Sequence, residues 1–111
     1  MTKNEPVGEI IFADKFFPLI TAGKKTTTVR AGKRFYDEGV YDVFNPSKEA
    51  HMLIRVENVE HTTFSKLTDK TALTDGFSSV EELKNELLQF YPNLTDDSVV
   101  TIVYFRFKEM Q

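Results

Sequence analysis

The segment V-V-T-I-V-Y-F-R-F-K, residues 99–108, has the clearest structural pattern in the chain. Val99, Thr101, Val103, Phe105 and Phe107 alternate with five residues that would face the opposite way, and this period of two predicts a β-strand. Nearly all of these side chains are β-branched or aromatic, which favours strands. We therefore predict one long strand near the C-terminal end and interpret the rest of the chain around it.

Upstream of this strand, further strands and helices alternate irregularly. Strands are predicted at residues 7–13, 26–30, 40–44 and 51–59, and helices at residues 15–22, 68–75 and 79–91. Because the order shows no regular β-α-β repeat, we expect an α+β fold with a curved or closed sheet.

Short signals mark where the helices begin and end. Asp14 is expected to cap the first helix, and Gly23 to end it in the left-handed conformation. The short helix should stop at Asp75-Gly76. For the last helix, Ser78 and Glu81 are spaced as a capping box.

Length and composition indicate a small globular protein. The 111 residues suit one domain, which we place at residues 7–111 after a polar tail at 1–6. The absence of cysteine excludes disulfides, thiolate zinc sites and cysteine nucleophiles. No apolar run approaches the ~18 to 20 residues of a membrane span, and none forms a signal-peptide core. We therefore expect no membrane association and a cytoplasmic location.

The net charge of −3 conceals a basic region. Between residues 15 and 34 no Asp or Glu interrupts the basic residues, which are Lys15, Lys24, Lys25, Arg30, Lys33 and Arg34. Such a run is typical either of a solvated basic face or of a site for an anionic partner. Its concentration favours the anionic partner.

Common enzyme signatures are missing. The chain contains no glycine-rich phosphate loop, no H-E-x-x-H and no G-x-S-x-G. His51 and His61 fit no helical ligand pair, so we interpret them as surface residues. We predict neither a metal nor a cofactor.

The segment G-K-K-T-T-T-V-R, residues 23–30, is the strongest candidate for the functional site. Strand alternation places Thr28 and Arg30 on one face, while Lys24 and Lys25 both precede the regular strand, so spacing does not choose between them. A threonine hydroxyl beside a lysine of lowered pKa suits nucleophilic catalysis. A plain threonine-rich strand is the alternative.

The pattern Gly23-x-Lys25-x-x-Thr28-x-Arg30 resembles the signature of the ASCH domain, G-x-K-x-x-[Thr or Glu]-x-R. Later landmarks follow in the order typical of these domains, namely Leu67-Thr68-Asp69-Lys70, Asp75-Gly76-Phe77, Glu82-Leu83 and Tyr91-Pro92. The resemblance implies a small PUA-like β-barrel of about five to six strands with two to three helices packed on it.

Thr at the variable position resembles the branch of bacterial enzymes that hydrolyse N(4)-acetylcytidine to cytidine and acetate. By this resemblance Thr28 is the nucleophile and Lys25 its base. The family's third catalytic group is a Glu, and this chain has the shorter Asp75 in its place. An Asp-Gly pair is equally typical of a helix-terminating turn.

Two kinds of partner follow from these patterns. The leading hypothesis is an amidohydrolase acting on an acylated nucleoside, with Lys24, Arg30, Lys33 and Arg34 binding the substrate and Tyr41 or Tyr104 lining the pocket. The alternative is an RNA-binding module, or a ribonuclease, that uses the same basic residues on single-stranded RNA. Protein partners are not indicated.

Overall fold

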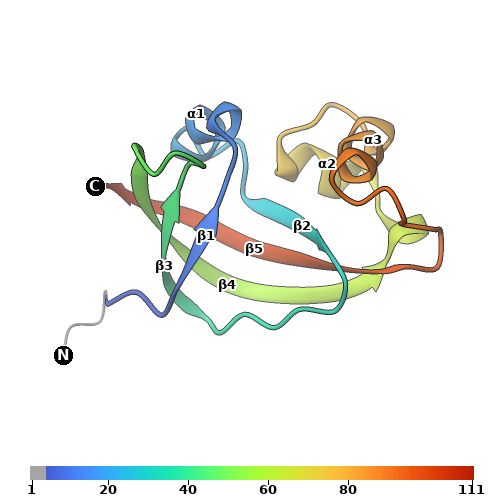
Figure 1. The fold of residues 1–111 in the computed structure, drawn as a ribbon, viewed down its shortest axis with the longest axis horizontal. Coiled ribbons are helices and arrows are strands. Elements are labelled where there is room, and N and C mark those ends of the chain that lie inside the picture. The colour runs from blue at the N-terminus through green and yellow to red at the C-terminus, as the bar shows by residue number, and fades with distance from the viewer. Residues whose placement is uncertain (1–4) are drawn as a thin grey trace.

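The computed structural model describes residues 5–111, so the first four residues of the predicted tail lie outside the described part (Figure 1). It contains five strands, three α-helices and two short 3-10 helices. In chain order these are β1 (Gly8–Ile11), η1 (Asp14–Phe16), α1 (Phe17–Thr21), β2 (Thr27–Ala31), β3 (Gly39–Phe44), β4 (His51–Thr63), η2 (Phe64–Lys66), α2 (Asp69–Asp75), α3 (Val80–Phe90) and β5 (Val99–Met110).

The strands form one mixed sheet in the order β1-β3-β4-β5-β2. β1 runs parallel to β3, and the other neighbouring pairs are antiparallel. The sheet curls into a half-barrel, with α1 packed above one part and α2 and α3 above the other (Figure 1). Its two edge strands, β1 and β2, do not pair with each other. The predicted α+β, PUA-like fold is confirmed.

The two longest strands, β4 and β5, pair with each other in the middle of the half-barrel. β4 continues to Thr63, four residues beyond the predicted end at Val59, and pairs with β5 along its length. The register shifts between Leu53 and Ile54 and again between Val56 and Asn58. Such bulges bend a strand and interrupt its alternation of apolar and polar residues. Because the residues after Val56 are also mostly polar, the sequence pattern does not show that the strand continues to Thr63.

Two of the expected helix caps are wrong. Asp14 caps no helix; its carboxylate instead accepts a hydrogen bond from Asn45 Nδ2 at 2.7 Å. Ser79, not Ser78, caps α3 and accepts from the Glu82 backbone N–H at 3.2 Å. Ser78 and Ser79 are each followed by a glutamate three residues later, so the sequence pattern could not show which serine caps the helix. Gly23 adopts the predicted left-handed conformation with φ of 75°.

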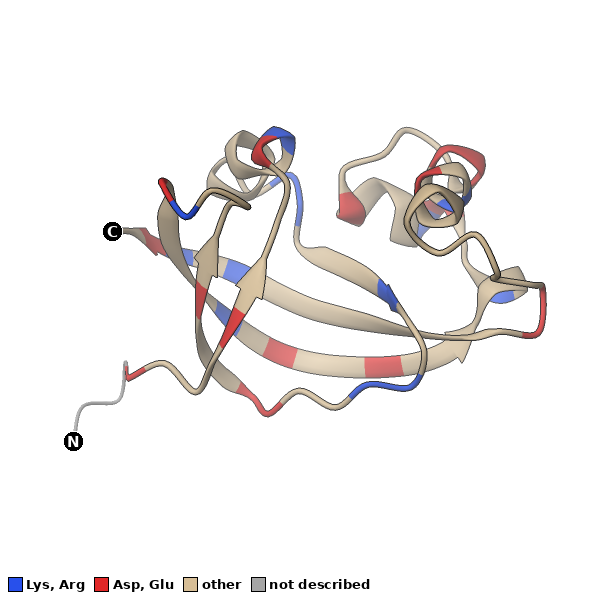
Figure 2. Ribbon diagram, in the orientation of Figure 1, with Lys and Arg blue, Asp and Glu red and all other residues tan. Residues whose placement is uncertain are grey.

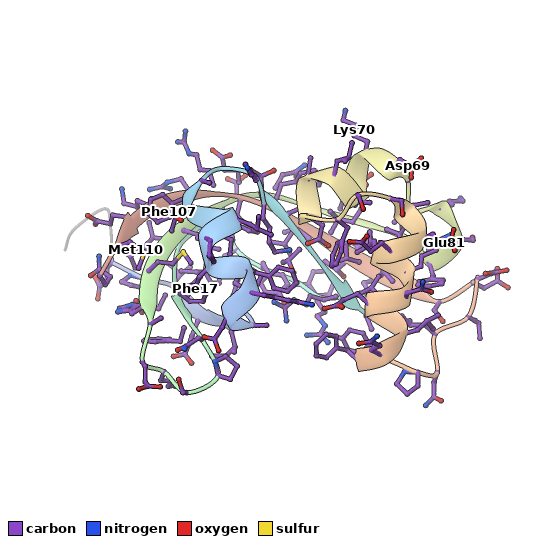
Figure 3. The ribbon with its side chains drawn as sticks, turned by 90° about the horizontal axis from the view of Figure 1, so that it is seen from above. Phe17, Asp69, Lys70, Glu81, Phe107 and Met110 are labelled. Carbon is purple, nitrogen blue, oxygen red and sulfur yellow. The ribbon has the colours of Figure 1, made fainter. Side chains whose placement is uncertain are left out.

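Two hydrophobic cores lie on the sheet. One packs α1 against β1, β3, β4 and β5, and the other packs α2 and α3 against β2 and β5. Phe17, Phe107 and Met110 lie at the end of the molecule remote from α2 and α3 (Figure 3). No helix in residues 5–111 combines the length and apolar character needed to cross a membrane.

Candidate functional site

A cavity of about 310 Å³ lies between the two hydrophobic cores. It opens where the half-barrel is incomplete, because its walls come from both edge strands together with the helices above them. The lining residues are Ile11, Phe12, Ala13, Phe16, Lys25, Thr28, Val29, Arg30, Pro46, Asp75, Phe77, Leu83, Glu86, Leu87, Phe90 and Tyr91.

Lys25 and Asp75 form a buried ion pair in the wall of this cavity. Lys25 Nζ contacts Asp75 Oδ1 and also donates to the Asp75 backbone carbonyl at 2.8 Å. The two residues are only 2% and 3% exposed. The ammonium also lies 4.5 Å from the ring centre of Phe16 and 5.5 Å from that of Phe12. Both charges are therefore held away from solvent, with partners on several sides.

Two turns of the chain, one after α1 and one at the end of α2, bring Lys25 and Asp75 together. After Gly23, the backbone N–H of Lys25 donates to the Leu19 carbonyl at 3.0 Å, which turns the chain back over the end of α1. Asp75 is the last residue of α2, and Gly76 follows it with φ of 99°. The shorter Asp side chain reaches Lys25 because the end of α2 packs directly beside the start of β2, where Thr26 N–H donates to Thr74 O at 2.7 Å.

Burial changes the pKa of both partners. It lowers the pKa of Lys25 and raises that of Asp75 to about 6, while the attraction between the two charges opposes each change. The lowered pKa of Lys25 and the raised pKa of Asp75 both favour transfer of a proton from the lysine ammonium to the aspartate carboxylate. A lysine that can lose its proton is what a general base at this site requires.

Thr28 and Arg30 lie on the same wall, as strand alternation predicted. Arg30 Nε donates to Thr28 Oγ1 at 3.2 Å, and Arg30 Nη2 donates to the Ile11 carbonyl at 3.2 Å. The guanidinium thus spans the open seam from β2 to the end of β1. Thr28 itself is 6% exposed, so its hydroxyl faces the cavity and not bulk solvent.

The other predicted binding residues lie elsewhere. Lys24, Lys33 and Arg34 are exposed and do not line the cavity. Of the two lysines that spacing left open, it is Lys25 that reaches the site. Tyr41 and Tyr104 do not line the cavity either: the Tyr41 hydroxyl donates to the Asp37 carbonyl at 2.8 Å, and that of Tyr104 donates to Glu60 at 2.6 Å.

The basic run does not form one free cationic face. Lys15 pairs with Glu86 at 2.7 Å and Lys25 pairs with Asp75. Figure 2 shows both blue and red segments on the elements above the sheet, and further blue segments in the loop after β2. Because the sequence distance between partners is long, the linear run could not reveal this compensation.

Histidine chemistry takes no part in the cavity. His51 Nε2 lies 2.7 Å from Asp42 Oδ1, and His61 Nε2 lies 2.7 Å from the Arg34 carbonyl. Within residues 5–111 no three His, Asp or Glu side chains are grouped so that they could hold a metal ion.

Sequence reasoning missed several side chains of the site. Glu86 lines the cavity from α3, and an edge-to-face pair of Phe16 and Phe77, 6.0 Å apart, joins its two sides. A signal for Glu86 was available, since it lies three residues after Leu83 and one before Leu87, on the inward face of the helix. The aromatic contacts depend on tertiary packing and had no such signal.

Comparison with solved structures supports the fold. The ASCH domain from Lactobacillus crispatus JV V101 superposes with a TM-score of 0.78 at 15% identity, covering 92% of this chain and 79% of that one. A protein from Enterococcus faecalis V583 gives 0.72 at 16% identity, covering 95% and 77%. The ASCH protein from Zymomonas mobilis gives 0.68 at 13%, covering 93% and 71%.

None of the curated protein sequences compared with this chain is a match. The family model described as the ASCH domain, in contrast, matches residues 7–109. This range includes the sheet except for Met110 at the end of β5, all three α-helices and every residue that lines the cavity. The chain belongs to the ASCH domain family.

Proposed function

We propose that this protein is an amidohydrolase that acts on N(4)-acetylcytidine or a similar acylated nucleoside, using its own side chains. One observation supports this most strongly: a threonine hydroxyl lines the same cavity as a buried lysine-aspartate pair. Replacing a buried ion pair by apolar residues is often neutral or stabilising, so this pair is poorly explained by stability alone. A chemical role explains why it is there.

The size and lining of the cavity suit such a ligand. Its volume of about 310 Å³ lies at the lower end of ordinary small-molecule sites. Aromatic rings from both sides of the seam, including Phe12, Phe16 and Phe77, provide apolar surfaces for a planar base. Arg30 Nε donates to Thr28 Oγ1, and Lys25 and Asp75 line the same cavity, so polar groups are available to orient one amide.

In the proposed reaction, Lys25 in its neutral form takes the proton of Thr28 Oγ, and the oxygen attacks the acyl carbonyl carbon. Arg30 stabilises the charge that develops on the carbonyl oxygen. The C–N bond then breaks, and the amine leaves with the proton from Lys25, so that an ester of Thr28 remains. Water hydrolyses this ester, releases acetate and restores the hydroxyl.

Asp75 would act on Lys25, not on the substrate. It holds the lysine amine in place through both its carboxylate and its backbone carbonyl. It also accepts the ammonium proton when Lys25 must be neutral. Both roles need contact with Lys25 only, which the shorter side chain provides.

The test is incubation of the folded protein with N(4)-acetylcytidine, with cytidine and acetate measured by chromatography. We expect Thr28→Ala to lower turnover on the order of a thousandfold or more, because the attacking oxygen is lost. Thr27→Ala is the matched control: Thr27 is also buried but bonds Thr74 Oγ1 at 3.1 Å and does not line the cavity. No turnover by the wild type, or unchanged turnover in Thr28→Ala, would refute the proposal.

RNA binding is the second candidate, and one surface feature favours it. Phe35 is 80% exposed and lies 5.9 Å from Lys33 Nζ, so that an aromatic face and a cation are presented together. This combination suits stacking of a base beside a phosphate. Titration with single-stranded RNA at rising salt tests it; binding that does not weaken with salt would exclude phosphate contacts.

A further inference from the structure

The face of α3 that lines the cavity runs from its interior to its mouth. Leu83, Glu86, Leu87 and Phe90 all line the cavity at the helical spacing of one face. Leu83 is 1% exposed and Phe90 is 65% exposed, so the first marks the interior and the second the rim. Seven residues of helix span about 10 Å, which gives the length of this path.

Glu86 lies on this path, one turn before the rim, and its side chain is 17% exposed. Lys15 Nζ approaches Glu86 Oε2 at 2.7 Å from the opposite side of the mouth, while the Lys15 side chain remains 56% exposed. Among residues 5–111 no hydrogen bond reaches the other carboxylate oxygen, Oε1. The carboxylate is thus positioned by its partner and keeps one acceptor for a ligand.

We propose that Glu86 is a specificity residue that accepts a hydrogen bond from a hydroxyl on the part of the ligand lying at the mouth, the sugar of a nucleoside. This inference rests on the proposed function, because that function places the acyl group beside Thr28. With the acyl group there and the planar base between the aromatic rings, the sugar lies toward Phe90. An ionised carboxylate can only accept, and sugar hydroxyls are the donors at that end.

The charge around Glu86 favours a neutral donor. Lys15 already compensates the carboxylate, so a second cation would gain little there. A phosphate would be repelled by Glu86 and could bind only by taking Lys15 from it. A hydroxyl needs neither change and satisfies the remaining acceptor.

The experiment measures ligand affinity in a variant without turnover, so that hydrolysis does not alter the ligand during the measurement. In a Thr28→Ala background, which leaves the acylated ligands intact, affinity is measured by calorimetry for N(4)-acetylcytidine and for the free base N(4)-acetylcytosine. We expect the nucleoside to bind about tenfold or more tightly than the base, as one hydrogen bond to a charged group allows. Adding Glu86→Met should reduce this ratio nearly to one, without changing the affinity for the base.

Glu81→Met is the matched control on the same helix, because the Glu81 side chain lies on the outer side of α3 (Figure 3). A ratio that stays unchanged in Glu86→Met, or falls equally in Glu81→Met, would overturn the role of Glu86 even if wild-type turnover supports the amidohydrolase. Failure to bind either ligand would overturn both proposals. Binding that depends on Glu86 without turnover by the wild type would refute hydrolysis alone and support recognition.

Discussion

The buried pair of Lys25 and Asp75 allows a quantitative prediction about stability. We consider three variants: Lys25→Met, Asp75→Leu and the double variant that combines them. Each single change leaves one buried ionisable group without its partner, which typically costs about 3–5 kcal/mol. The double change leaves none, because both new side chains are apolar and of similar size.

Proton exchange sets an upper limit on the part of each single penalty that comes from burying a charge. An unpaired Asp75 can take up a proton, which at about pH 7 costs about 4 kcal/mol because its ordinary pKa of 3.8 lies about 3 units lower. An unpaired Lys25 can release its proton, which costs about 5 kcal/mol from an ordinary pKa of 10.5. The double variant should be close to the wild type in stability, or up to a few kcal/mol more stable.

The two single penalties should change with pH in opposite directions. In Lys25→Met the folded-state pKa of Asp75 lies above its unfolded value, so the penalty is absent below about pH 4 and grows as the pH rises. In Asp75→Leu the folded-state pKa of Lys25 lies below its unfolded value, so the penalty grows as the pH falls and disappears above about pH 10.

Urea unfolding followed by far-UV circular dichroism, at acidic, neutral and alkaline pH, measures these free energies. The double variant closes a mutant cycle and isolates the coupling between the two side chains. If the double variant lost as much stability as the two single variants together, the pair would not act as a unit. Penalties independent of pH would show that the unpaired groups are not forced to neutralise.

Two further predictions concern the elements that position the site, and both use the same unfolding assay. Ser79→Ala should lower the free energy of unfolding by about 1 kcal/mol through loss of the α3 cap, whereas Ser78→Ala should have a smaller effect; equal losses would contradict the assigned cap. Gly76→Ala should cost about 1–2 kcal/mol for its left-handed backbone, plus a contact of 3.1 Å between the new Cβ and Leu19 Cδ1. At Gly23, also left-handed, the added Cβ meets nothing within 4 Å, so Gly23→Ala should cost less; the reverse order would refute the contact.

Much of the fold could be predicted because the strongest local patterns agree with the tertiary structure. The alternation at residues 99–108 lies in β5, where Val103 and Phe105 pack into one hydrophobic core and Val100 and Ile102 pack into the other. The left-handed Gly23 was also predictable, since glycine is the usual residue there. The end of β4 was not, because its bulges break the alternation on which the prediction depends.

In the candidate site, too, some features could be predicted from local patterns and others could not. Thr28 and Arg30 share a wall because strand alternation is a local rule, and the structure confirms that placement. Which lysine faces the cavity depends on the turn after Gly23 and on where α2 ends, and neither is encoded in the spacing of residues 24–30. Glu86 belongs to the cavity only because α3 lies across the open seam, a relation between distant segments.

The pairing of β2 with β5 also has a consequence for how the protein folds. Thr28 faces Val103, so the strand that carries the candidate nucleophile pairs with a segment on the far side of α2 and α3 in the chain. Closing such a long loop costs entropy before any contact compensates for it, which slows folding. Until β5 is in place, the strand that carries Thr28 has no neighbour in the sheet. The candidate site is therefore complete only when β5 has paired with β2, and a chain interrupted before β5 would lack the site altogether.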